Sequence, residues 1–227
     1  MDDKKLLYLS EINLFEELPL EELKGIGKIS KMESVTKGSK IISSQNPPDS
    51  LFVLKEGQVR LYIESKNNKQ FTIDILGPGN IFGETTSFSI TDHNVFAESM
   101  SEVILCTITK NDFEEFISQN PRLAIRFIEI LSSRLNEVYA TSELIANREV
   151  RYRLLFLLMR LSEKFGKRKN EWQTIEVKIT HNDLGTMIGS TRETVSALIS
   201  QLKKEGIVAR TPTGLKIHAK RASEELD

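Results

Sequence analysis

The sequence predicts an α+β protein that has an N-terminal β-roll, a long dimerisation helix and a C-terminal winged helix-turn-helix. Three observations predict this fold class. Short apolar runs, several with period-two alternation, occupy residues 40–108. Apolar residues at heptad spacing follow in residues 121–145. Two short helical segments about a glycine, at 179–202, then precede a predicted β-hairpin at 207–218.

The β-roll prediction depends on five short runs and on the turn residues between them. Two runs flank the polar Asn67-Asn68 loop, so we expect them to form a hairpin. Cys106 lies within the last run and is therefore predicted to be a buried strand residue. Asn111-Asp112 then opens a short helix. The runs are 40–44, 51–55, 58–64, 70–76 and 102–108. A short helical stretch precedes them, with apolar markers at Phe15, Leu18, Leu20 and Leu23.

A long helix is predicted to follow the β-roll. Asn120 and Pro121 suit an N-cap and a first helical residue, and the helical pattern continues for about seven turns. Apolar and small residues spaced alternately by four and three form a heptad seam, which predicts a parallel coiled coil of two copies. A second stripe, Leu123, Phe127 and Ile130, can face the β-roll. The alternative is a helix buried within one monomer. The seam residues are Ala124, Ile128, Leu131, Leu135, Val138, Ser142 and Ile145.

The remainder of the chain is predicted to form a separate domain. Asn147 can cap a helix that ends at Gly166, and 174–178 is predicted to be a short strand. The strongest motif comes next. Thr180 with Asp183 suits the cap of a first short helix, Gly189 a tight turn, and Ser190 with Glu193 a capping box for a second helix. The run 207–210, the turn 211–214 and the run 215–218 then form a wing.

In a helix-turn-helix, the first residues of the second helix point at base edges in the major groove. Arg192 can donate two hydrogen bonds to guanine, and Glu193 can accept one from cytosine N4. A capping role alone would also explain Glu193. Ser190 and Thr191 belong to the same turn, and Thr194 and Ser196 can contact phosphate or a thymine methyl group. The candidates for contact with the DNA backbone are Thr180, His181, Lys203, Lys204, Arg210 and Lys216.

Charge and composition agree with these predictions. Residues 1–146 carry 15 basic and 22 acidic side chains, whereas residues 147–220 carry 15 basic and only 7 acidic ones. Such a basic region is expected of a module that binds a polyanion, although a solvated charged face is the simpler explanation. The single cysteine excludes an internal disulfide framework and an iron–sulfur cluster. No apolar run approaches the roughly 20 residues that span a bilayer, so we expect a cytoplasmic protein with no membrane partner.

These residues resemble the catabolite activator protein family, the bacterial cyclic-AMP receptor and FNR-like regulators. The most specific motif is Gly-Ser-Thr-Arg-Glu-Thr-Val at 189–195, joined by Gly38, Gly57 and Phe82-Gly83-Glu84 in the β-roll. The resemblance implies a cyclic-nucleotide-binding-like jelly roll at 1–120, the dimerisation helix at 121–146 and the DNA-binding domain at 147–227. It also implies a homodimer on two-fold symmetric double-stranded DNA, a small-molecule effector at the β-roll, and contact with RNA polymerase if the protein is an activator.

Two departures from this family change the expected ligands. Relatives that bind cyclic nucleotides follow Gly-Glu with an arginine for the phosphate, but no arginine occurs between Arg60 and Arg122. A buried phosphate without a cation is costly to desolvate, so we expect an effector other than cyclic AMP, or none. Many relatives also place an arginine where this chain has Ala197, so one base contact is expected to be missing. The resemblance implies an effector pocket at Phe82, Gly83, Glu84, Thr85, Thr86, Asn94, Val138 and Tyr139.

Three alternative functions are haem binding, metal-dependent catalysis and a role as an adaptor that contacts proteins. Haem ligation would fall to His93, the only histidine in residues 1–146, but a loop histidine is more often a surface residue. A cupin-type metalloenzyme needs several histidines and a carboxylate together, so we expect neither a metal centre nor catalysis. A sensor or adaptor whose helix-turn-helix contacts proteins remains an alternative to a DNA-binding regulator. The sequence identifies no cofactor.

Overall fold

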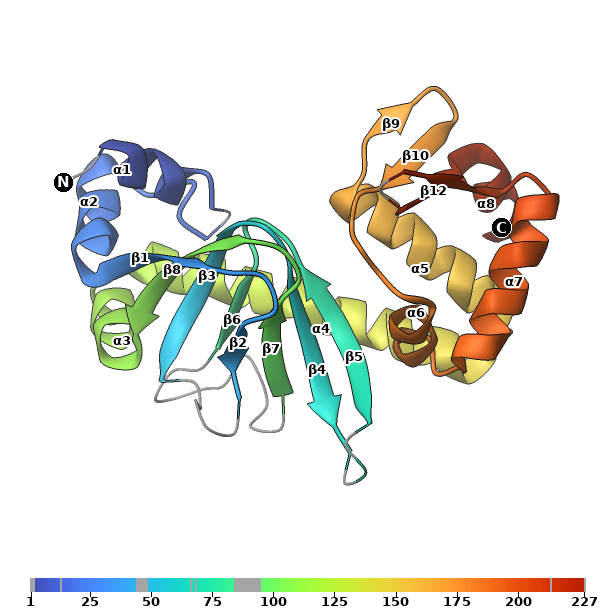
Figure 1. Cartoon of the computed structure of the whole chain (residues 1–227). Coiled ribbons are helices and arrows are strands. Elements are labelled where there is room, and N and C mark those ends of the chain that lie inside the picture. Colours follow the sequence, from blue (N-terminus) through green and yellow to red (C-terminus); the bar gives the residue numbers. More distant parts are fainter. Residues whose placement is uncertain are drawn as a thin grey trace. The chain divides into compact units, whose positions relative to one another are not determined.

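The computed structural model describes residues 3–12, 14–43, 49–65, 67, 69–83, 95–212 and 214–226. The chain divides into two compact units, which are described separately below (Figure 1). One unit contains residues 1–70 and 74–136, and the other contains residues 71–73 and 137–227.

The first unit contains two antiparallel sheets. Its strands are β1 (Ser30–Val35), β2 (Lys40–Ile42), β3 (Ser50–Glu56), β4 (Val59–Glu64), β5 (Gln70–Leu76), β6 (Ile81–Gly83), β7 (Val95–Ser99) and β8 (Val103–Thr109). One sheet has the order β1-β8-β3-β6 and the other the order β2-β7-β4-β5. The neighbouring positions of β4 and β5 confirm the predicted hairpin. The β-roll predicted from the short apolar runs is therefore confirmed.

Period-two alternation in β3 and β8 produces two hydrophobic cores. Leu51 and Val53 in β3 join one core, whereas Leu54 joins the other. In β8, Ile108 and Leu105 are divided in the same way. The central sheet therefore packs against helices on one face and against the second sheet on the other. Full burial of each such side chain contributes about 1.5–3 kcal/mol.

Helices cover the outer face of this central sheet. They are α1 (Asp3–Ser10), α2 (Leu20–Ile29), α3 (Lys110–Gln119) and the first part of α4 (Pro121–Asn147). Leu123 and Phe127 of α4 are buried in the helical core, and Ile130 is partly buried against it, as the second stripe predicted. Although α4 has 27 residues, no helix among the described residues is long and apolar enough to cross a membrane.

Several predictions for the first unit were incomplete or wrong. Strands β1, β6 and β7 were not predicted, because β1 has little apolar alternation and β6 has only three residues. The N-terminal apolar markers do not form one helix, since Phe15 lies in a turn and Pro19 caps α2. The helix α3 begins before Asn111, because the Thr109 side chain accepts a hydrogen bond from the Asp112 amide. Cys106 is buried, as predicted, and burial raises the pKa of its thiol.

The second unit contains the last part of α4, four further helices and a small sheet. The helices are α5 (Val150–Phe165), α6 (His181–Met187), α7 (Arg192–Lys204) and α8 (Ala219–Leu226). The strands are β9 (Arg168–Lys169), β10 (Trp172–Ile175), β11 (Val208–Thr211) and β12 (Gly214–His218), in the order β11-β12-β10-β9. The antiparallel pair β11 and β12 confirms the predicted wing. Gly166 ends α5, also as predicted.

Two boundaries in this unit differ from the prediction. Asn147 does not cap α5, because α4 continues through it and the Arg148 amide still donates to the Leu144 carbonyl. Glu149 is the N-cap of α5 and makes no side-chain capping bond. The strand expected at 174–178 begins earlier, because Trp172 to Ile175 pair with β12 before the chain turns toward α6.

Candidate nucleic-acid interface

The first helix of the helix-turn-helix begins with the predicted cap. The Asp183 amide donates to the Thr180 hydroxyl (3.1 Å), and the Thr180 amide donates to the Asp183 carboxylate (3.0 Å). This reciprocal capping box satisfies two amides that the helix leaves without partners. Asp183 is buried, and both its amide and its carboxyl group are hydrogen-bonded to Thr180, so it holds the start of the helix in place. Thr180 itself is exposed.

The turn between the two helices depends on glycine. Gly189 has a φ of +62°, a left-handed conformation that favours glycine. The Ser190 amide then donates to the Gly185 carbonyl (2.7 Å) and closes the turn. The predicted cap of the second helix was wrong by one residue. Thr191, not Ser190, is the N-cap, because its hydroxyl accepts from the Thr194 amide (3.2 Å).

The helix α7 has one buried face and one exposed face. Its buried residues are Val195, Ile199 and Leu202. Arg192 and Glu193 are the first two residues of the helix and are exposed. Because Thr191 is the cap, each lies one position nearer the helix start than the sequence suggested. The exposed face continues along the helix at Ala197, Ser200, Gln201 and Lys204, of which Ser200 and Gln201 were not predicted.

Basic side chains gather around His181 at the start of α6. Burial lowers the pKa of His181, and Lys203, Arg192 and Arg210 lower it further. Burial and Arg210 also lower the pKa of Lys203. Among the described residues, no carboxylate forms an ion pair with these three cations. The cluster is therefore a local excess of positive charge, which suits a phosphate.

Hydrogen bonds connect His181 to the start of α7. The Ser196 hydroxyl donates to the Arg192 carbonyl (2.8 Å) and lies 2.8 Å from His181 Nδ1. Because a hydroxyl has one proton, we assign Nδ1 as the donor to Ser196 and Nε2 as the acceptor in the neutral ring. The predicted contact residues His181, Arg192 and Ser196 are thus held together.

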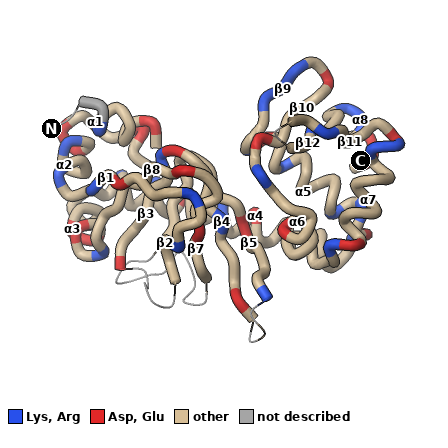
Figure 2. The backbone as a smooth tube through the Cα atoms, viewed as in Figure 1, with Lys and Arg blue, Asp and Glu red and all other residues tan. Residues whose placement is uncertain are grey.

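The wing carries the remaining predicted contacts. Arg210 in β11 is exposed. Lys216 in β12 lies over the Trp172 ring, with Nζ 4.5 Å from the ring centroid, so this amine is partly engaged within the domain. Lys and Arg, drawn blue in Figure 2, also occur on β9 and α8.

The heptad seam of α4 is largely uncovered by the chain itself. Ile128 is 61% exposed, Leu135 49%, Val138 56% and Ile145 44%. Ser142 is exposed as well, whereas Ala124 and Leu131 are partly buried. Exposed apolar side chains in such a row mark an interaction surface.

The predicted effector pocket is described only in part. Residues 84–94, including Glu84, Thr85, Thr86, His93 and Asn94, lie outside the described residues. Phe82 is fully buried and stacks on Phe52, with ring centroids 5.2 Å apart, so it is a core residue. Arg134 of α4 donates to the carbonyl of Ile81 (3.0 Å). A guanidinium therefore lies beside β6, although no arginine occurs between Arg60 and Arg122.

A β-roll, a long helix with an apolar seam and a winged helix-turn-helix define the class of a DNA-binding protein with an additional β-roll domain. The cyclic nucleotide-binding domain family matches residues 32–120, and the Crp-like helix-turn-helix domain family matches residues 152–222. The transcriptional regulator SdrP of Thermus thermophilus is 30% identical over 162 residues, which are 71% of this chain and 76% of that protein.

Two further comparisons, one with a sequence and one with a solved structure, also point to proteins of this organism. A cyclic AMP receptor protein is 25% identical over 177 residues, covering 78% of this chain and 79% of that protein. A solved CRP/FNR-family transcriptional regulator has a TM-score of 0.70 and 26% identity, covering 86% of this chain and 98% of that one. The chain belongs to the CRP/FNR family and is a DNA-binding transcription regulator rather than an enzyme. The family resemblance of the 189–195 motif is thus confirmed.

Proposed function

We propose that this regulator acts as a homodimer that binds a two-fold symmetric DNA site through α7. The observation that carries the proposal is the exposed first turn of α7, where Arg192 and Glu193 have no role in the hydrophobic core. In a helix-turn-helix this turn enters the major groove. Arg192 contacts guanine and Glu193 accepts from cytosine, so each half-site contains a G·C pair.

The basic side chains around His181 indicate where the DNA backbone lies against the protein. Lys203 and Arg210 have no carboxylate partner among the described residues, so a phosphate would neutralise charge that the fold leaves uncompensated. Lys216 makes a weaker contribution because Trp172 already holds its amine. The remaining contacts come from Thr180, Ser190, Thr191, Thr194, Ser196 and Lys204.

Exposure of the seam supports the homodimer. The large apolar side chains of the seam recur at alternate spacings of three and four residues, and a second copy of α4 would cover them. In this arrangement residues 1–120 form the sensor, 121–146 the dimerisation helix and 147–227 the DNA-binding domain. The protein works in the cytoplasm, where its DNA is, and contacts RNA polymerase if it activates transcription.

The sensor responds to a small effector other than cyclic AMP. The guanidinium of Arg134 lies beside β6, but it already donates to the Ile81 carbonyl, and the Asp74 carboxylate lies 3.9 Å away. Val138 and Tyr139 on α4 offer an exposed surface that is apolar apart from the Tyr139 hydroxyl. Both observations favour a less polar ligand than a cyclic nucleotide.

Selection of DNA from a random pool tests the proposal. The full chain should enrich fragments that share an inverted repeat with a G·C pair in each half, and sedimentation should show a dimer on that DNA. Enrichment without a common sequence, or of a single unrepeated half-site bound by a monomer, would contradict the proposed function.

A further inference from the structure

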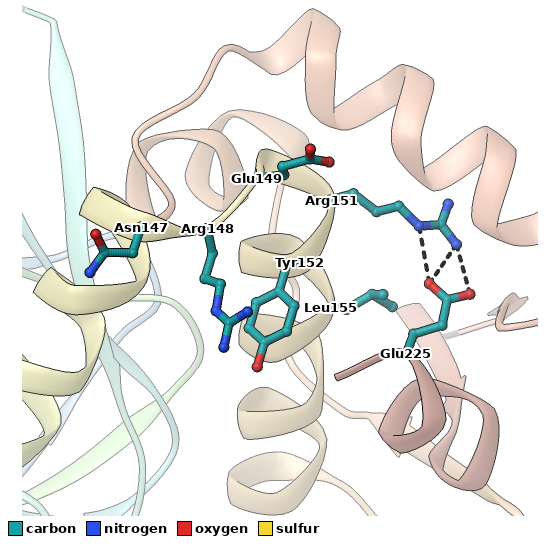
Figure 3. A pocket seen from close by; sticks show the side chains of 7 residues that line it. All are labelled: Asn147, Arg148, Glu149, Arg151, Tyr152, Leu155 and Glu225. Carbon is teal, nitrogen blue, oxygen red and sulfur yellow. Dashed lines mark hydrogen bonds and ion pairs between the residues drawn. The ribbon is translucent and has the colours of Figure 1, made fainter. Parts of the chain in front are cut away.

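A group of charged residues joins three helices of the second unit at the end of α7 opposite its base-contacting turn. Arg151, in the first turn of α5, donates from Nη2 to Glu205 Oε2 (2.6 Å). The same guanidinium donates to both carboxylate oxygens of Glu225 in α8, at 2.8 Å and 2.7 Å. Figure 3 shows Arg151 and Glu225 facing each other at the side of an open pocket. Glu205 is the C-cap of α7, so one arginine connects α5, α7 and α8.

Two further hydrogen bonds fasten α8 to the same neighbours. Arg221 of α8 donates from Nη1 to the Glu205 carbonyl (3.1 Å), which places a cation at the negative end of the α7 dipole. The Tyr152 hydroxyl of α5 donates to the Leu226 carbonyl (2.9 Å). We call the four charged residues Arg151, Glu205, Arg221 and Glu225 the α8 clasp.

The ion pairs of the clasp contribute little to global stability. The side chains of Arg151, Glu205 and Glu225 are 26%, 36% and 35% exposed, so water and salt screen their attraction. The geometry is nevertheless specific, because one planar guanidinium is shared between carboxylates from two different helices. Ion pairs that stabilise the fold little but require a specific geometry are suited to orienting one helix relative to another.

We propose that the α8 clasp is a positioning element for DNA recognition, which fixes the tilt of α7 relative to α5. This inference rests on the proposed function of α7. The helix is 13 residues long, or roughly 20 Å at 1.5 Å per residue. A tilt of about 5° at the clasp therefore displaces the first turn by roughly 1.7 Å, far more than a base hydrogen bond tolerates. Loosening the clasp weakens binding to the correct sequence more than binding to random DNA.

Two neighbouring glutamates of α8 provide a matched test. Glu225→Gln removes a clasp carboxylate, whereas Glu224→Gln removes the same charge from the adjacent exposed residue, which is outside the clasp. Dissociation constants of the full chain are measured for the selected site and for random DNA at one salt concentration. We expect Glu225→Gln to lower the ratio of specific to random affinity about three- to tenfold, the size of one hydrogen bond. Glu224→Gln should leave the ratio unchanged.

A second variant and the wild-type chain complete the experiment. Glu205→Gln should lower the ratio in the same direction, so the proposal does not depend on one variant that folds poorly. Equal ratios for Glu225→Gln, Glu205→Gln and Glu224→Gln would overturn the clasp while the wild-type preference for its site stays intact. A wild-type chain without sequence preference would instead overturn the proposed function, and the clasp with it.

Discussion

Replacing Arg192 with alanine should weaken binding to the best DNA site without destabilising the protein. Arg192 is the first residue of α7 and is exposed, and no ion pair joins it to another described residue. The substitution should therefore change the free energy of unfolding little and should mainly weaken the complex with DNA. A bidentate contact between arginine and guanine contributes about 1–3 kcal/mol, which corresponds to a loss of roughly 5- to 150-fold in affinity for each half-site.

The control for this variant is a cation that we assign to the DNA backbone. Arg210 serves better than Lys216, whose amine lies over Trp172. Arg210→Ala should weaken all sequences alike and should reduce the slope of log affinity against log salt by about 0.9 for each lost phosphate contact. Fluorescence anisotropy between about 50 and 200 mM salt, on the selected site and on random DNA, separates the two behaviours. If Arg192→Ala weakened both DNAs equally, Arg192 would be a phosphate contact and the assignment of base reading would be refuted.

Three further predictions concern assembly, the effector and pH. Leu135→Asp should give a monomer that loses site-specific binding, because two carboxylates would enter an apolar interface, whereas the exposed, off-seam Asn136→Asp should remain dimeric in sedimentation. Cyclic AMP should not raise the melting temperature, although a ligand at about 100 times its dissociation constant would stabilise by roughly 2.7 kcal/mol; a shift of several degrees would contradict this. Burial and the cations around it lower the folded pKa of His181 below its unfolded value of about 6.5, so the unfolded chain binds the proton more readily and stability should fall as the pH drops below that value. The loss of stability at low pH should be smaller in His181→Gln. A pH dependence identical to that of the wild type would show that His181 does not cause the loss.

The order of the elements could be predicted because burial repeats along the chain with a clear period. Alternation in β3 and β8 and the heptads of α4 are consequences of which face is covered. Strand β1 gave no such signal, since its sequence SKMESV contains only two apolar residues that do not alternate. Its place in the sheet comes from pairing with β8, a partner 68 to 78 residues away that local sequence does not specify.

The cap of α7 was predicted correctly by residue type but not by position. Ser190 and Thr191 are adjacent hydroxyl residues, and each has a suitable partner three residues later, so the sequence cannot choose between them as the cap. The choice depends on the turn at Gly189, where the Ser190 amide is already used by the Gly185 carbonyl. The clasp was missed for a different reason, because Arg151 and Glu225 are 74 residues apart and meet only in the folded domain.

Two groups of cations in the second unit have different partners. Arg151 and Arg160 of α5 form ion pairs with carboxylates at the end of α7, in α8 and in the last part of α4, and Arg221 of α8 donates to a carbonyl at the end of α7. Arg192, Lys203 and Arg210 have no carboxylate partner among the described residues and surround the start of α6 and α7. Such a concentration of like charge lowers the stability of the folded protein, because neighbouring cations repel one another. The same cations favour the binding of a polyanion, because each contact with a phosphate is attractive and releases a counterion. The uncompensated charge of Arg192, Lys203 and Arg210 is thus the strongest physical reason to expect DNA at the start of α6 and α7 rather than at the clasp.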